Sequence, residues 1–355
     1  MAALANPIGN RPIKVLIVDD SVVIRRLVTM ALDEDPAFEV AGVAANGKIA
    51  LAKIPQVEPD VLTLDIEMPE MNGLETLEQV KKHYPKLKVV MFSTLTERGA
   101  TSTLKALSLG ADDYVTKAAN VGSLDTSLKR LRGELGPKIK QFFGISPVAP
   151  VAATPRPVVA RQRLTKPISV IAIGSSTGGP NALAEIIPSL PAGIGCPIVV
   201  TQHMPEMFTR LLAERLDSQS KLHVEEAQEG SLVEPGKVLI APGKYHMGFR
   251  REGAQVVAAL NEGPMENSCR PAVDVMFRSA REIWPGESLA VILTGMGKDG
   301  FLGIEDLKKD GCPVIAQDKA TSVVWGMPGF VVEADLADEV VPLGGIAAAI
   351  QQYVR

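Results

Sequence analysis

The stretch "IAIGSSTGGPNAL", residues 171–183, decides the fold of the second half of this chain. An apolar run ends at Gly174, two serines and a threonine follow, and a glycine pair leads into a helix-like sequence. A buried strand, a glycine turn and a helix in this order form the repeating unit of α/β proteins. The turn fits G-x-S-x-G with Ser176 at its centre, which predicts a strained turn that exposes a reactive serine and makes Ser175 a spacer.

An anion site is the alternative interpretation of the same glycines, because a helix N-terminus behind a tight turn binds phosphate. The stretch lacks the Gly-Lys-Ser/Thr of a P-loop, however, and its G-x-x-x-G-G spacing differs from the dinucleotide fingerprint. A nucleophilic serine also needs a base and an orienting acid, which have to be found elsewhere in the chain.

Four histidines are candidates for the base. His203 follows the apolar run 197–202, so it is expected at the carboxyl edge of a sheet, beside the strand that carries the serine. His246 follows another strand-like run and is the alternative. His83 and His223 are expected at the surface.

The acid is sought in "LTGMGKDG", residues 293–300, where Asp299 lies in a glycine-rich loop. Backbone N–H groups of this loop could form an oxyanion hole. Asp274 is the alternative, although it lies in a helix-like segment where capping is the simpler role. The order Ser176, His203, Asp299 differs from the Ser…Asp…His order of α/β-hydrolases, so a separate solution on a doubly wound sheet is expected.

Both halves of the chain alternate short apolar runs with helical patterns, which predicts two doubly wound α/β domains with mostly parallel sheets. The exception is an antiparallel hairpin expected over 243–262. In the first half, residues 21–35 are expected to form a helix. The predicted strands are 14–18, 60–64, 88–92, 169–173, 197–202, 237–242, 289–295 and 313–318. One face of the first predicted helix carries Val23, Leu27, Met30 and Ala31.

Carboxylates follow two predicted strands of the first half. Asp19 and Asp20 come after the first, and Asp65 comes after the second. At one sheet edge these groups repel each other, which a hard cation such as Mg²⁺ relieves, and one of them can then attack a phosphoryl group. Ser93 and Lys117 also follow strands and can reach the same pocket.

Six prolines, the first Pro137 and the last Pro167, divide the chain. Such a sequence has no periodic apolar face, so residues 134–166 are expected to be an extended linker. The predicted domains are therefore 12–133 and 167–355, which are ordinary domain sizes.

Composition excludes several classes of protein. The net charge of −4 argues against nucleic acid as a partner, and three scattered cysteines fit a reducing compartment without a structural zinc site. The N-terminus does not have the pattern of a signal peptide, and no apolar run reaches the roughly 20 residues of a membrane span. A cytoplasmic protein without membrane insertion is expected.

Residues 12–133 resemble the receiver domains of bacterial response regulators, which have a flavodoxin-like fold. The resemblance implies that Asp65 is the phosphoacceptor and that Asp19, Asp20 and the backbone carbonyl of Glu67 hold Mg²⁺. It also implies that Ser93 is the switch hydroxyl and that Lys117 pairs with the phosphate. One departure is Ala118, where the family usually has proline.

Residues 168–352 resemble the protein-glutamate methylesterases of bacterial chemotaxis, through "IGSSTGGP", "TQHMP", "IAPG..HM", "RPAVDV", "LTGMGKDG" and "VVWGMPG". The resemblance implies the triad Ser176, His203 and Asp299, with the backbone N–H of Met296 as an oxyanion donor. The implied substrates are methylated glutamates of chemoreceptor cytoplasmic domains, and receptor glutamines for deamidation. No cofactor is implied for hydrolysis, and a chemotaxis histidine kinase is implied as phosphodonor.

Two rival hypotheses stand beside a phosphorylation-activated esterase. One is a non-enzymatic response regulator whose second domain binds a ligand or partner. The other is a cysteine hydrolase built on Cys269, a position at which relatives often carry histidine.

Overall fold

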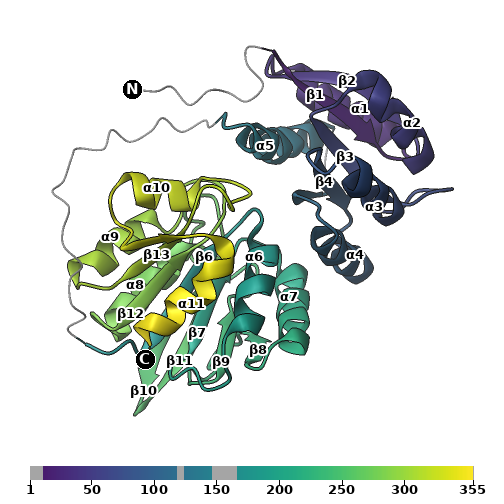
Figure 1. Ribbon diagram of the computed structural model, residues 1–355. Helices are drawn as coiled ribbons and strands as arrows, with labels where there is room; N and C mark the ends of the chain where they lie inside the picture. The colour runs from purple at the N-terminus through teal and green to yellow at the C-terminus, as the bar shows by residue number, and fades with distance from the viewer. Residues whose placement is uncertain (1–10, 118–123, 146–165, 355) are drawn as a thin grey trace. The chain divides into compact units, whose positions relative to one another are not determined.

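A computed structural model describes residues 11–117, 124–145 and 166–354. The chain forms two compact units, Met1–Pro147 and Val148–Arg355, each with its own sheet (Figure 1). Ala118, the departure noted above, and most of the predicted linker lie outside the described residues.

The first unit is built on five parallel strands in the order β2-β1-β3-β4-β5. The strands are β1 (Ile13–Val18), β2 (Phe38–Ala44), β3 (Val61–Asp65), β4 (Lys88–Ser93) and β5 (Asp113–Thr116). From β1 the chain first adds β2 on one side and then adds β3, β4 and β5 on the other, so the topological switch point lies between β1 and β3. Ligands of doubly wound sheets bind at the carboxyl ends of the strands beside such a point.

Five helices cover the two faces of this sheet. They are α1 (Val22–Asp33), α2 (Gly47–Val57), α3 (Gly73–His83), α4 (Glu97–Ser108) and α5 (Leu124–Phe142). Helices α1 and α5 share one hydrophobic core with the sheet, whereas α2 packs on α3. The face predicted for α1 was wrong in part, because Val23 and Met30 are exposed and Val28 and Leu32 are buried instead. Apolar residues occur all around this helix, so its pattern does not define one face.

Helix α5 corrects the predicted end of the first domain. It continues to Phe142, so the boundary at residue 133 falls inside the helix. Leu135 and Ile139, four residues apart, are fully buried in the core of the first unit. This buried stripe continues past Pro137, which therefore does not mark the start of the linker.

The second unit contains seven parallel strands in the order β14-β13-β12-β6-β7-β9-β8. The strands are β6 (Val170–Ser175), β7 (Ile198–Gln202), β8 (His223–Glu226), β9 (Lys237–Ile240), β12 (Ser288–Ile292), β13 (Val314–Gln317) and β14 (Glu339–Val341). The edge strands β8 and β14 have no counterpart among the predicted strands, because they are short and half-exposed. The switch point lies between β6 and β12, since the chain moves away from β6 first to one side and later to the other.

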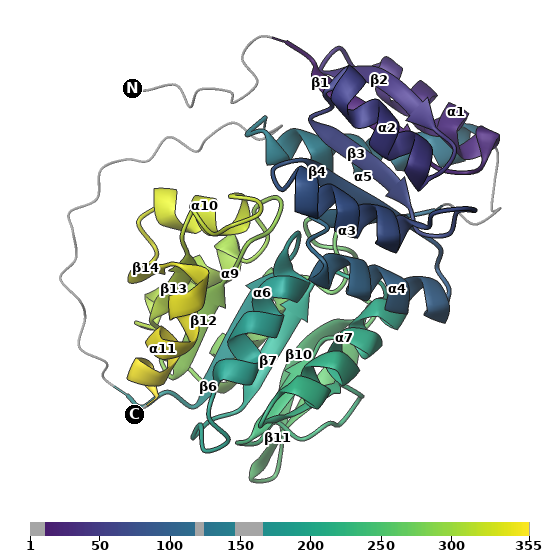
Figure 2. The ribbon, with the colours of Figure 1, turned by 45° about the vertical axis from the view of Figure 1, so that its right-hand side comes forward.

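Helices again cover both faces. They are α6 (Gly179–Ile186) with a 3₁₀ turn (Ile187–Ser189), α7 (Glu206–Gln219), α8 (Val273–Ile283), α9 (Phe301–Lys309), α10 (Met327–Glu333) and α11 (Leu343–Tyr353). Figure 2 shows α6 and α7 in front of the strands, and α8 packs on α9 and on β10 on the other side. The predicted hairpin is confirmed as β10 (His246–Glu252) paired antiparallel with β11 (Gln255–Asn261).

Candidate functional site

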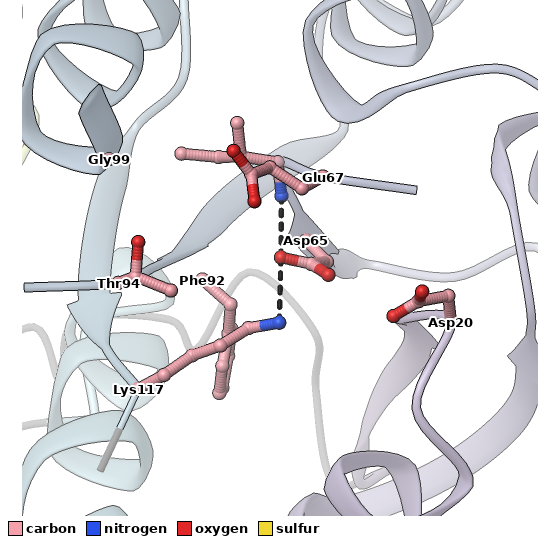
Figure 3. Close-up of a pocket in the computed structure, with 8 residues that line it drawn as sticks. Asp20, Asp65, Glu67, Phe92, Thr94, Gly99 and Lys117 are labelled. Atoms are coloured by element: carbon pink, nitrogen blue, oxygen red, sulfur yellow. Dashed lines mark hydrogen bonds and ion pairs between the residues drawn. The ribbon is translucent and has the colours of Figure 1, made fainter. Parts of the chain in front are cut away.

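All the predicted phosphorylation residues of the first unit except Ser93 lie at one pocket at the switch point. Asp65 ends β3, Asp19 and Asp20 follow β1, and the nearest oxygens of the three carboxylates lie within 4.8 Å of one another. The Lys117 ammonium lies 2.9 Å from Asp19 Oδ2 and 2.8 Å from Asp65 Oδ1. Figure 3 shows Lys117 and Asp20 on either side of Asp65, in a pocket of about 290 Å³.

Burial dominates the electrostatics of this pocket. It raises the pKa of Asp65 to about 6, a shift that Asp19 reinforces and Lys117 opposes. The pKa of Lys117 is also raised, because its two carboxylate partners outweigh the effect of burial. A buried pair of carboxylates with one lysine is thus short of positive charge at neutral pH.

A divalent cation fits this cluster. The buried oxygen Asp19 Oδ2 accepts no hydrogen bond among the described residues, and its polar contact is the ion pair with Lys117. Three carboxylates at this spacing are the hard oxygen ligands that Mg²⁺ prefers. Glu67 also lines the pocket, with its side chain directed to Arg98 at 3.4 Å, so the backbone of Glu67 is the part left for a ligand.

The structure places Ser93 differently from the other predicted residues. Its hydroxyl is buried and lies 2.6 Å from Thr103 Oγ1 in α4, so it faces that helix and not the pocket. Thr94, the next residue, lines the pocket (Figure 3). Two adjacent hydroxyls at the end of a strand point to opposite faces, and the sequence alone did not indicate which one meets the pocket.

The serine turn of the second unit follows β6 as predicted. Ser175 is fully buried and donates a hydrogen bond to Gln202 Oε1 at 2.7 Å, whereas Ser176 is partly exposed. Gly178 has φ +80°, and a Cβ there would lie 2.7 Å from Val323. The turn therefore requires glycine at this position, and it leaves Ser176 as the accessible hydroxyl.

His203 and Asp299 meet at the carboxyl edge of the same sheet. His203 follows β7, Asp299 lies in the loop after β12, and His203 Nε2 is 2.7 Å from Asp299 Oδ2. Since a carboxylate only accepts, Nε2 carries the proton and Nδ1 is the free base of the neutral ring. The backbone N–H groups of Val273, Asp274 and Gly300 also donate to Asp299. Burial raises the pKa of Asp299, but His203 and the N–H groups of Val273 and Asp274 outweigh burial and lower the pKa.

Among the described residues, Cys269 is the polar neighbour of Nδ1 of His203, the ring nitrogen that does not face Asp299. Its sulfur lies 3.5 Å from Nδ1, and the described residues show no hydrogen bond between Ser176 and His203. Burial lowers the pKa of His203, but the contacts with Cys269 and Asp299 outweigh this effect and raise the pKa to about 10. Among the described residues, Nδ1 of His203 therefore contacts Cys269 and makes no hydrogen bond with Ser176.

The loop after β12 approaches Ser176 closely. The N–H of Ser176 donates to Thr294 O at 3.1 Å, and a Cβ on Gly295 would lie 2.9 Å from the Cβ of Ser176. The N–H of Ser176 is therefore occupied. The N–H of Met296, one residue further along, has no acceptor within the described part of the chain.

The other candidates have structural roles. His246 is buried, donates from Nε2 to Pro264 O at 2.9 Å and accepts from the N–H of Ala272 at Nδ1. Asp274 accepts from the N–H of Gly303 at 2.7 Å, near the start of α9. His83 and His223 are exposed, as predicted.

Asn267 is a site residue that the sequence analysis missed. Its Nδ2 lies 2.9 Å from Asp299 Oδ1 and 2.9 Å from Asp274 Oδ2. Asn267 and Ser268 both have positive φ. Asparagine tolerates this conformation better than most residues, so an asparagine in a loop segment was the available signal.

Fold and site together define a two-part protein: a receiver-type phosphoacceptor domain joined to a serine hydrolase domain with a doubly wound sheet. The family description "CheB methylesterase" matches residues 171–350, and "Response regulator receiver domain" matches residues 15–129. The chain belongs to the CheB methylesterase family.

Similar proteins cover almost the whole chain. A protein-glutamate methylesterase/protein-glutamine glutaminase of Trichodesmium erythraeum is 48% identical over 95% of this chain and 97% of its own length. A protein of the same name from Thermotoga maritima is 45% identical over 94% of this chain and 96% of its own length. The crystal structure of a Thermotoga maritima CheB methylesterase catalytic domain is 48% identical, with a TM-score of 0.51, over 52% of this chain and 98% of that domain.

Proposed function

We propose that this chain hydrolyses the methyl esters of glutamate side chains on chemoreceptor cytoplasmic domains, with Ser176, His203 and Asp299 as its catalytic triad. The observation that carries this proposal is the 2.7 Å contact between His203 and Asp299 at the sheet edge where β6 presents Ser176. The names of relatives that cover nearly the whole chain support the substrate class.

The chemistry follows from the free nitrogen of His203. Nδ1 takes the proton of Ser176 while the serine oxygen attacks the ester carbonyl, and Asp299 stabilises the resulting imidazolium. The imidazolium returns the proton to the leaving methoxide, so that methanol departs and an acyl-enzyme remains. Water then attacks the acyl-enzyme while Nδ1 takes its proton, and the imidazolium returns that proton to the oxygen of Ser176, so that the free glutamate leaves. The sulfur of Cys269 has to leave Nδ1 before Ser176 can use it.

The N–H of Met296 is proposed to stabilise the oxyanion of the tetrahedral intermediate. Its lack of an acceptor in the described residues and its place one residue beyond Gly295 support this role. Glutamine amides of the receptors react through the same intermediate, with ammonia in place of methanol as the leaving group.

Asp65 is proposed to accept a phosphoryl group from a chemotaxis histidine kinase. Asp19, Asp20 and the backbone carbonyl of Glu67 would hold Mg²⁺, and the charge of the ion would offset the negative charges of the carboxylates and of the phosphoryl oxygens. Lys117, already 2.8 Å from Asp65, pairs with the phosphate, and Ser93 acts as the switch hydroxyl after its side chain rotates away from Thr103. The carboxylate of Asp65 attacks phosphorus, the P–N bond to the phosphorylated histidine of the kinase breaks, and Asp65 becomes an acyl phosphate while the kinase histidine leaves.

Phosphorylation of Asp65 is proposed to activate the esterase by shifting the population of domain arrangements towards one with an open site. The presence of both domains in one family of proteins supports this coupling. The proposed location is the cytoplasm. Among the described residues, the structure has no helix that is both long and apolar enough to cross a membrane.

Methanol release from methylated receptor membranes tests the proposal. The full chain, Ser176→Ala and Asp65→Asn are compared with and without a small phosphodonor and Mg²⁺. We expect the phosphodonor to stimulate the wild type only, Asp65→Asn to keep its basal rate, and Ser176→Ala to be inactive. Methanol release by Ser176→Ala at the wild-type rate would rule out the serine mechanism.

A further inference from the structure

Helices α8 and α9 cap each other at the catalytic site. The N-cap residue of α8, Ala272, offers no capping side chain, and the carboxylate of Asp299 accepts from the first two N–H groups of this helix, of Val273 at 2.7 Å and of Asp274 at 3.0 Å. Helix α9 likewise has no capping side chain at Gly300. The carboxylate of Asp274 takes that role by accepting from Gly303.

This reciprocal capping places two buried carboxylates side by side. Asp274 is fully buried and Asp299 is 2% exposed. The two negative charges repel each other, and burial with this repulsion raises the pKa of Asp274 to about 6. Two such groups need hydrogen-bond donors between them if both are to remain ionised.

Asn267 supplies these donors. The Nδ2 group has two N–H bonds, and its 2.9 Å contacts direct one to Asp274 Oδ2 and the other to Asp299 Oδ1. Only the nitrogen end of the amide can face two acceptors, so the network fixes its orientation. The residue itself is exposed, so the amide closes the network on the side that faces solvent.

We propose that Asn267 and Asp274 are positioning residues for the ester hydrolysis, which act through Asp299 to fix its carboxylate and to set the protonation of His203. The inference rests on the proposed function. Among the described residues, five groups donate hydrogen bonds to the carboxylate of Asp299. Of these five, the side chain of Asn267 is the one that also donates to the carboxylate of Asp274.

The charged groups around this network determine the direction of the expected effects. His203 faces Asp299, Cys269 faces His203, and Glu266, paired with Arg278, faces Asp274. Loss of the neutral donor Asn267 makes Asp299 more basic, which stabilises the imidazolium. Loss of the negative charge of Asp274 has the opposite effect.

The test uses the full chain with Asn267→Gly, Asp274→Asn and the matched control Ser268→Gly. Glycine suits the positive φ of both loop positions, and Ser268 has no described contact with the carboxylates. NMR titration of His203 and the pH profile of kcat/KM for methanol release are measured for each variant. Thermal unfolding checks that each variant is folded.

We expect Asn267→Gly to move the acid limb of the profile and the His203 titration up by about 0.5–1 pH unit, with a roughly ten-fold lower kcat. Asp274→Asn should move both downward, and Ser268→Gly should move neither. Equal shifts in Asn267→Gly and Ser268→Gly, or shifts of the same sign for Asn267→Gly and Asp274→Asn, would overturn the proposal. A wild-type chain that releases no methanol would contradict the proposed function. The NMR titration of His203 needs no turnover, so it would still test the inference in that case.

Discussion

Alkylation of Cys269 should inactivate the esterase, although the proposed nucleophile is a serine. The sulfur lies 3.5 Å from Nδ1 of His203, the nitrogen that has to accept the proton of Ser176. Proton transfer requires Ser176 Oγ within about 3 Å of that nitrogen. An acetamide group on the sulfur occupies this space, and loss of a general base lowers rates by about 10²–10⁴-fold. We therefore expect at least a hundred-fold loss of kcat.

Selective labelling should be straightforward, since the other two thiols are poor targets. Cys196 and Cys312 are buried, whereas Cys269 is partly exposed. Burial raises the pKa of Cys196 to about 11, so about 1 in 3,000 of these groups is a thiolate at pH 7.5, and burial raises that of Cys312 as well. Iodoacetamide under native conditions should add one group per chain.

The assay follows methanol release and the mass of the intact protein during the reaction with iodoacetamide. Cys269→Ala should remain active and become insensitive to the reagent, and Cys196→Ala should behave as the wild type. Stoichiometric labelling of Cys269 with full activity would refute the assignment of Nδ1 as the base. An inactive Cys269→Ala would instead favour the cysteine hydrolase considered above.

Three further predictions concern the two serines, the phosphoacceptor and the metal. Ser176→Ala should lower kcat by more than about 10³-fold, whereas Ser175→Ala, which loses its buried bond to Gln202, should lower the free energy of unfolding by about 1 kcal/mol in a denaturant titration and keep most activity. The pKa of Asp65 is raised from 3.8 to about 6 in the folded state, so ionisation of Asp65 destabilises the fold increasingly between about pH 4 and pH 6 and in full above pH 6. Asp65→Asn should therefore raise the free energy of unfolding of the first unit by about 3 kcal/mol at pH 7 without divalent cations, and this gain should disappear towards pH 4. A gain independent of pH would contradict this cause. EDTA should abolish labelling of Asp65 by a phosphodonor and leave the basal rate of methanol release unchanged.

Sequence alone predicted the residues that directly follow buried strands. Ser176, His203 and Asp65 each come at or just after an apolar run, and the carboxyl ends of parallel strands share one edge. The orientation of Ser93 could not be predicted, because rotation of its side chain depends on Thr103, which lies on another element. The end of the first domain was placed too early because the segment from residue 134 was taken as part of the proline-rich linker, while Leu135 and Ile139 continue the buried face of α5.

The choice between Asp299 and Asp274 shows why the acid needed the structure. Asp274 lies in the first turn of α8 and Asp299 lies in the loop just before α9. Both carboxylates accept backbone N–H groups, so capping does not distinguish the two residues. The two carboxylates differ in what lies opposite the acceptor positions that the helix N–H groups do not use. The oxygens of Asp274 face Gly303 and Asn267, both of which are fixed donors, whereas Oδ2 of Asp299 also meets the ring of His203. Asp299 is thus the proposed catalytic acid, because its remaining acceptor points to a titratable partner. That direction depends on how α8 and α9 cross, which no local sequence pattern specifies.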